Sequence, residues 1–152
     1  MKKENFKIQI IEQLHQILCE REREAEKAIA EITLSRDADS KSSAGDKHET
    51  SRAMAQIELD KNEVQFQKIK NLKSELLQIN PQAQHQKIET GSLVFTNCEN
   101  YFFSIGYGKI ILGEQVFYAI SLASPIGKAL HKKSKGDNIQ FQEREIKILE
   151  IY

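Results

Sequence analysis

Residues 35–45 read SRDADSKSSAG, and this stretch decides how the first half of the chain folds. Its serines, aspartates and lysine favour a connection, and Gly45 is the only glycine before Gly91. Neither proline falls in the first 80 residues, so no other breaker interrupts them. The stretch therefore predicts a single link between two long helices.

Helical periodicity is present on both sides of this link. Before it, apolar residues recur at steps of three and four, and after it a second series shifts by one residue partway along. Each series predicts a helix with a narrow apolar stripe, and we expect the two stripes to pack together as an antiparallel coiled-coil hairpin over residues 1–80. The stripes are Ile11, Leu14, Leu18, Ala25, Ala28 and Ile32 in the first helix, and Met54, Ile57, Val64, Ile69, Leu72, Leu76 and Ile79 in the second.

The composition changes at Pro81, after which short β-type runs are separated by glycines or polar pairs. Ser124-Pro125 is typical of an N-cap followed by proline at the first helical position, so a short helix is expected through Leu130 or His131. Residues 81–152 are thus expected to form a small α+β domain with an antiparallel sheet. The expected strands lie at 93–95, 101–105, 109–112, 116–120, 138–142 and 145–151.

Bulk properties limit the classes of function. The 152 residues carry 22 Lys plus Arg and 22 Asp plus Glu, so no overall charge draws the chain to nucleic acid or to an anionic membrane. Cys19 and Cys98 fit neither a metal site nor a disulfide framework. This cysteine usage suits a reducing cytoplasm, which is the compartment we expect. No continuous apolar run occurs, so neither a signal peptide nor contact with a membrane is expected. We also expect a monomer.

The most informative polar cluster is Gly45-Asp46-Lys47-His48-Glu49, within a predicted acidic tip at about 37–49. Asp46 as N-cap and Glu49 three residues later would form an acidic variant of the capping box. The same spacing places two carboxylates at the end of the hairpin, where they are available to a cation. Mg²⁺ is commonly held by one or two carboxylates together with water and phosphate oxygens. Both interpretations stay open on the pattern alone.

Two motifs resemble the Gre family of bacterial transcript-cleavage factors. The run from Ser121 to Leu130, SLASPIGKAL, followed by Gly136-Asp137, is similar to the family's pattern around a Ser-Pro helix, and the family's Gly-Asp-x-x-Glu is matched at 45–49. His131 stands where an aliphatic residue is usual. The resemblance covers nearly the whole chain and implies a coiled-coil hairpin followed by an FKBP-like domain.

For function, the resemblance implies a transcription elongation factor whose hairpin enters the secondary channel of a backtracked RNA polymerase. Asp46 and Glu49 would carry the catalytic and metal-binding roles, because they would help hold a second Mg²⁺ beside the nascent RNA 3′ end. Mg²⁺ would be bound only within the polymerase complex, and the chain alone would have no cofactor. It would stimulate the polymerase's own cleavage activity without being an enzyme, while residues 81–152 would dock at the channel rim.

Other functions stay open. Thr50 stands where the family usually has Asn, and Ala53 where it usually has an aromatic residue, which favours a regulator that occupies the channel without causing cleavage. A coiled-coil adapter for an unrelated partner is a further alternative. A stand-alone hydrolase is disfavoured, because no nucleophile with a base, metal-ligand set or phosphate-binding glycine loop is evident. The basic run from Lys128 to Lys135 is interpreted as a solvated helix end, with contact to an acidic rim or to RNA as the alternative.

Overall fold

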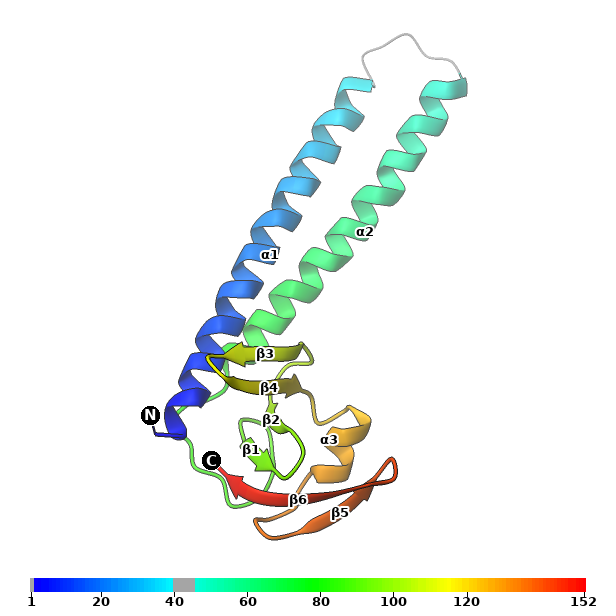
Figure 1. The fold of residues 1–152 in the computed structure, drawn as a ribbon. Helices are drawn as coiled ribbons and strands as arrows, with labels where there is room; N and C mark the ends of the chain where they lie inside the picture. Colours follow the sequence, from blue (N-terminus) through cyan, green and yellow to red (C-terminus); the bar gives the residue numbers. More distant parts are fainter. Residues whose placement is uncertain (1, 40–45) are drawn as a thin grey trace. The chain divides into compact units, whose positions relative to one another are not determined.

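The protein is a chain of two long helices followed by a six-stranded sheet with one short helix (Figure 1). The structure, a computed structural model, describes residues 2–39 and 46–152, and of residues 39 and 46–48 it describes the backbone alone. The chain divides into two compact units, His15–Ser74, and Met1–Leu14 together with Glu75–Tyr152. Over the described ranges, no helix has an apolar stretch long enough to cross a bilayer.

Helices α1 (Glu4–Asp39) and α2 (Asp46–Leu77) confirm the two long helices expected from the sequence. Within the unit His15–Ser74 they lie side by side and run in opposite directions (Figure 1). Lys73 pairs with Glu22 at 2.7 Å, and Arg36 donates a hydrogen bond to Gln56 at 2.8 Å. The position on α2 falls as the position on α1 rises, which fixes the antiparallel order.

The buried face of α1 follows the predicted stripe. Leu14 and Leu18 are buried, and Ala25 and Ile32 are half-buried farther along the helix. Apolar residues at steps of three and four lie on one side of a helix, which is why one narrow face of α1 is shielded.

The buried face of α2 differs from the predicted one. Leu59 and Ile69 are 5% and 4% exposed, whereas Met54, Ile57 and Val64 are 65%, 58% and 57% exposed. The sequence prediction for the first half of α2 was therefore wrong. At 3.6 residues per turn, Ile57 lies about 160° around the helix from Leu59, so α2 carries two apolar stripes on opposite sides. Only the stripe that contains Leu59 is shielded.

The sheet has the strand order β3-β4-β2-β1-β6-β5. All neighbouring strands are antiparallel except β2 and β4, which are parallel. The expectation of an antiparallel sheet is thus correct for most of it and wrong for this one pair. The strands are β1 (Leu93–Thr96), β2 (Asn100–Phe103), β3 (Gly108–Leu112), β4 (Gln115–Ile120), β5 (Asn138–Phe141) and β6 (Arg144–Ile151).

The parallel pair follows from how the chain leaves β2. Strand β3 takes the outer edge, and the two-residue turn Gly113-Glu114 then returns the chain as β4 into the position beside β2. Gly113 has a φ of 61°, the left-handed conformation that such tight turns require. Because β4 reverses β3, it runs in the same direction as β2.

Helix α3 (Pro125–Leu130) confirms the predicted N-cap. The Ser124 hydroxyl accepts a hydrogen bond from the Gly127 amide at 3.0 Å and donates one to the Ser121 carbonyl at 2.7 Å. Leu130 is buried in the core with Ile88, Phe103 and other apolar residues of β1, β2 and β6. The short helix thus closes one side of this core.

The first turns of α1 belong to the same compact unit as the sheet. The ring of Phe6 lies 5.2 Å from that of Phe117 in β4. Lys3 forms an ion pair with Glu150 of β6 at 2.8 Å, and its ammonium lies 4.9 Å from the centre of the Phe95 ring. The start of α1 and Lys3 just before it therefore pack on residues from three strands.

Candidate functional site at the start of helix α2

The predicted acidic tip lies at the start of α2, which begins at Asp46. Glu49 follows three residues later, so the two positions share one face of the helix. Gly45 and the side chains of Asp46 and His48 lie outside the described part of the structure. The predicted N-cap and capping-box contacts of Asp46 fall there too, as do Ser42 and Ser43.

The side chain of Glu49 is exposed, as are those of Thr50 and Ala53 in the same two turns. An exposed carboxylate is a hard oxygen ligand that suits Mg²⁺, but one carboxylate alone does not make a metal site. Among the described side chains, no group of three or more His, Cys, Asp or Glu residues is arranged to hold a metal ion.

A chain of hydrogen bonds links the two helices near this end. Arg36 of α1 donates from its guanidinium to the side-chain oxygen Oε1 of Gln56 at 2.8 Å, and the side-chain nitrogen Nε2 of Gln56 donates to the Asp60 carboxylate at 2.9 Å. Arg36 also contacts the Asp37 carboxylate at 3.4 Å. Most of these residues are exposed, so the contacts contribute little to the free energy of folding. They hold the last turns of α1 beside α2.

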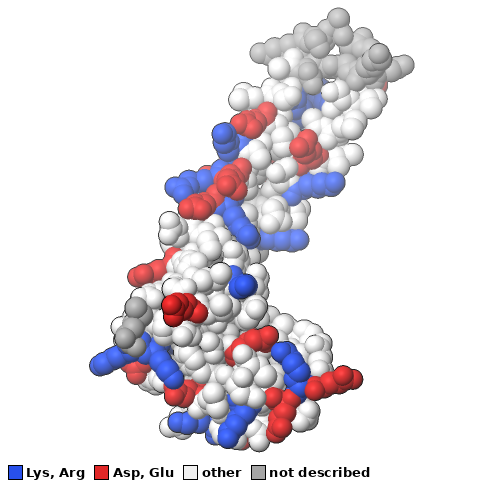
Figure 2. All heavy atoms as spheres, viewed as in Figure 1, with Lys and Arg blue, Asp and Glu red and all other residues white. Residues whose placement is uncertain are grey.

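Charges along the helix pair are mixed in sign. Figure 2 shows Lys and Arg interspersed with Asp and Glu over α1 and α2, with no large area of one sign on this face. Lys73 and Glu22 form an ion pair that joins the two helices. The hydrogen bond from the Lys73 ammonium to the Glu22 carboxylate raises the pKa of Lys73.

The C-terminal motif has a structural explanation in the start of α3. A Cβ atom added at Gly127 would lie 2.2 Å from the Ser121 carbonyl oxygen, which no real side chain tolerates. Ser121, Ser124 and Gly127 are thus needed together to form this tight connection. The basic side chains after it are exposed, in keeping with a solvated helix end: Lys128, His131, Lys132, Lys133 and Lys135.

Sequence reasoning missed two polar groups in the unit that contains the sheet. Lys7 is 2% exposed, and its ammonium donates a hydrogen bond to the Ala83 carbonyl at 2.9 Å. His85 pairs with Glu89 at 2.7 Å. The interval of four residues between His85 and Glu89 is their only signal in the sequence, and nothing in the sequence predicts the burial of Lys7.

The geometry thus gives an exposed carboxylate near the start of one of two long antiparallel helices, and a capped short helix in the sheet unit. Of the two predicted site residues, Asp46 and Glu49, only Glu49 has a side chain that the structure describes. Comparison of the chain with protein-family models, with curated proteins and with solved structures gave no match in any of the three.

Proposed function

We propose that this chain is a transcription elongation factor that inserts its two long helices into the secondary channel of a bacterial RNA polymerase. In this proposal α1 and α2 form a coiled-coil hairpin, and the unit with the sheet is FKBP-like. The start of α2 reaches the polymerase active site and stimulates cleavage of backtracked RNA. Asp46 and Glu49 are the residues that act.

The observation that supports this most is the exposed Glu49 carboxylate, one turn into a helix that begins at Asp46. Helices α1 and α2 have 36 and 32 residues, which at about 1.5 Å per residue makes each about 50 Å long. Two antiparallel helices of this length suit delivery of a side chain into a narrow channel. The match of residues 45–49 to the family's acidic motif adds to the argument.

The chemistry asked of this chain is small. Cleavage of the backtracked RNA is a hydrolysis in which a water oxygen attacks the phosphorus atom and the ribose 3′ oxygen leaves. Two-metal sites assist such displacements by stabilising both the attacking and the leaving oxygen. Asp46 and Glu49 would supply carboxylate oxygens to a second Mg²⁺ at the polymerase active site and help orient the water. The polymerase itself contributes the remaining ligands and the substrate.

The sheet unit has the separate task of binding the polymerase at the rim of the channel. Its SLASPIGKAL motif builds the capped helix α3, whose Ser124 side chain contacts backbone groups on both sides of the helix start. A motif whose polar groups are used for folding supports a scaffold better than a catalytic centre. The sheet unit is therefore assigned docking, and the start of α2 is assigned the reaction.

A cleavage assay tests the proposal. RNA polymerase stalled in a backtracked complex with end-labelled RNA is incubated with Mg²⁺ and the wild-type protein, and the RNA is expected to shorten. The double variant Asp46→Ala with Glu49→Ala should lose this activity while still binding polymerase. Glu63→Ala, which removes another exposed carboxylate of α2, serves as the matched control and should cleave as the wild type does.

Two results would contradict the proposal in different ways. Absence of shortening by the wild-type protein would exclude a cleavage factor, and cleavage that survives the double substitution would exclude Asp46 and Glu49 as its site. The second candidate, a channel regulator that does not cause cleavage, is favoured by Thr50 and Ala53, both exposed beside Glu49. It predicts competition with other channel ligands and altered elongation with intact RNA. Failure to bind polymerase at all would favour an adapter.

A further inference from the structure

A cavity of about 510 Å³ lies within the compact unit that contains the sheet. Its walls come from the last turn of α2, the segments before β1 and after β2, and the connection from β4 to α3. Ile79 and Leu122 give it aliphatic surface, and Glu75 gives it a carboxylate. This volume is sufficient for a small organic molecule.

His85 is the most constrained polar group in the wall of this cavity. Its side chain is 9% exposed, and its Nδ1 atom lies 2.7 Å from a carboxylate oxygen of Glu89. A carboxylate partner favours the hydrogen on Nδ1, which leaves a lone pair on Nε2. The Nε2 atom is buried and has no hydrogen-bond partner in the described part of the chain. His85 thus offers a fixed, unused acceptor.

Ser104 lines the same cavity and repeats this feature. Its hydroxyl oxygen is buried without a hydrogen-bond partner among the described residues, although its backbone amide is held by the Ile120 carbonyl at 2.9 Å. Buried polar side-chain atoms in native proteins nearly always have a partner. These two are the only unpartnered ones found among the described side chains, and both belong to residues that line one cavity.

The charge of the cavity wall selects the kind of ligand. Among the described residues that line it there is no lysine or arginine, and Glu75 is the one carboxylate. Burial of an anion without a cationic partner is costly, so phosphates and carboxylates are disfavoured. A cation gains a partner in Glu75 and finds two further acceptors in His85 and Ser104.

We propose that this cavity binds a small aliphatic ammonium ion. The three N–H groups of a primary ammonium match three acceptors, the Glu75 carboxylate, His85 Nε2 and Ser104 Oγ, while its alkyl chain packs on Ile79 and Leu122. This binding site does not depend on the proposed role in transcription. The cavity lies in the sheet unit, for which the sequence predicted docking on a partner and no ligand.

Gly91 makes room for this ligand. A Cβ atom added there would lie 3.3 Å from His85 Nε2, tighter than ordinary van der Waals contact. Because Nε2 is shielded from solvent, the ammonium must displace a neighbouring group to reach it, and the absence of a side chain at Gly91 leaves this nitrogen less crowded. The Gly91 amide, held by the Phe103 carbonyl at 2.7 Å, fixes the backbone at this point.

Titration of the full-length protein at neutral pH with three probes of one chain length tests the proposal: n-butylammonium, n-butanol and butyrate. Amide resonances of Gly91 and Ser104 in ¹⁵N-labelled protein are followed by NMR. The ammonium should give saturable shifts, the alcohol should bind at least about tenfold more weakly, and butyrate should give no saturable shift. Equal binding of the alcohol or the anion would overturn the ligand class, and the absence of saturable shifts would overturn the site.

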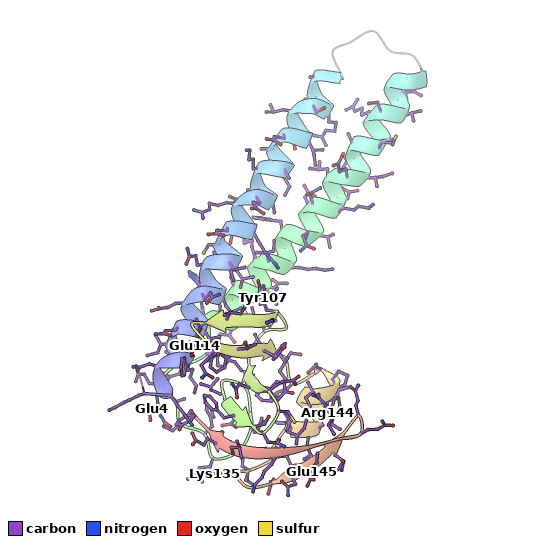
Figure 3. All side chains as sticks on the ribbon, in the orientation of Figure 1. Glu4, Tyr107, Glu114, Lys135, Arg144 and Glu145 are labelled. Carbon is purple, nitrogen blue, oxygen red and sulfur yellow. The ribbon has the colours of Figure 1, made fainter. Side chains whose placement is uncertain are left out.

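Two variants locate the binding. Ser104→Ala and Glu75→Gln should each weaken n-butylammonium binding about fivefold to tenfold. Glu114→Gln removes the same charge from the β3–β4 turn, where Figure 3 labels the residue, and should leave the affinity unchanged. Since the Ser104 hydroxyl has no hydrogen-bond partner among the described residues, Ser104→Ala should keep the wild-type spectrum elsewhere. Unchanged affinity in both cavity variants would overturn the assignment.

Discussion

The ammonium of Lys7, in the first turn of α1, donates a hydrogen bond to the carbonyl oxygen of Ala83 across 2.9 Å, although Lys7 is only 2% exposed. Burial favours the neutral amine and lowers the pKa of Lys7 to about 8. A charged group is thus kept in the unit that contains the sheet at a cost that depends on pH.

This burial predicts that stability rises with pH between about 8 and 10.5. In that range the unfolded chain, whose lysine has the ordinary pKa of 10.5, binds more protons than the folded one, so the free energy of unfolding increases by up to about 3 kcal/mol. Below pH 8 both states are protonated, and Lys7 adds no slope. Urea unfolding at a series of pH values measures the effect.

Lys7→Met is the matched variant for that experiment, because it keeps the length of the side chain and removes the charge. The difference in unfolding free energy between wild type and variant should then contain the slope. Taking this difference also removes the contribution of Tyr101 and Tyr152, which is the same in both proteins. The raised pKa values of these two tyrosines make stability fall with pH above about 10, opposite to the effect of Lys7. A difference that stays constant from pH 7 to 10 would contradict the assignment.

A second prediction concerns the two stripes of α2. Leu59→Ala should lower the unfolding free energy by about 2 to 4 kcal/mol, because Leu59 is 5% exposed in the helix pair. Ile57→Ala should change it by less than about 0.5 kcal/mol, because Ile57 is 58% exposed. Thermal or urea unfolding followed by circular dichroism distinguishes them. Equal losses would mean that both stripes are shielded.

The exposed stripe has a separate functional expectation. Ile57 and Val64, with the exposed Lys61 between them, line a shallow hollow on α2. If α2 enters a polymerase channel, Ile57→Gln with Val64→Gln should weaken polymerase binding severalfold while the unfolding midpoint stays unchanged. Competition binding with a labelled wild-type protein measures this change. Unaltered affinity would show that this face of α2 makes no contact in the complex.

A fourth prediction follows from the tight start of α3. Gly127→Ala should cost about 3 kcal/mol, because its Cβ atom would lie 2.2 Å from the Ser121 backbone oxygen and the chain must shift. Gly106→Ala is the control, since a Cβ atom there would meet nothing within 4 Å. Unfolding midpoints of the two variants should differ clearly. Similar midpoints would mean that the α3 connection relaxes freely.

The last prediction concerns the residues after the acidic tip. If Thr50 and Ala53 limit RNA cleavage, the double variant Thr50→Asn with Ala53→Tyr should cleave backtracked RNA severalfold faster than the wild type under the same Mg²⁺ concentration. Both side chains are exposed on α2, so folding should tolerate the change. A single-turnover cleavage rate measures it. No gain would indicate that these positions do not set the activity.

Much of the fold could be predicted because its signals are local. Ser124-Pro125 carries its own N-cap geometry, and the strands from β1 to β6 coincide with short β-rich runs bounded by glycines or polar residues. The antiparallel order of the helices followed from a single glycine-containing link. These features depend on neighbours in sequence, where periodicity and turn chemistry apply.

What the sequence could not supply depends on distant contacts. Periodicity predicted one apolar stripe on α2, through Ile57, whereas the structure shields the side that carries Leu59. The parallel pairing of β2 with β4 could be predicted only if β3 were known to leave the place beside β2 empty for β4. Ser104 and His85 come together across the sheet unit, and no spacing in the sequence predicts such a meeting.

The packing of Phe6 against Phe117 has a practical consequence for dividing the molecule. A fragment that begins at Pro81 would lack Phe6, Lys3 and Lys7, and the surface of β4 and its neighbours that they cover would be left bare to water. Such a fragment would tend to aggregate when expressed alone. The sheet unit therefore needs the first residues of the chain as part of its own packing, although they are far from it in the sequence.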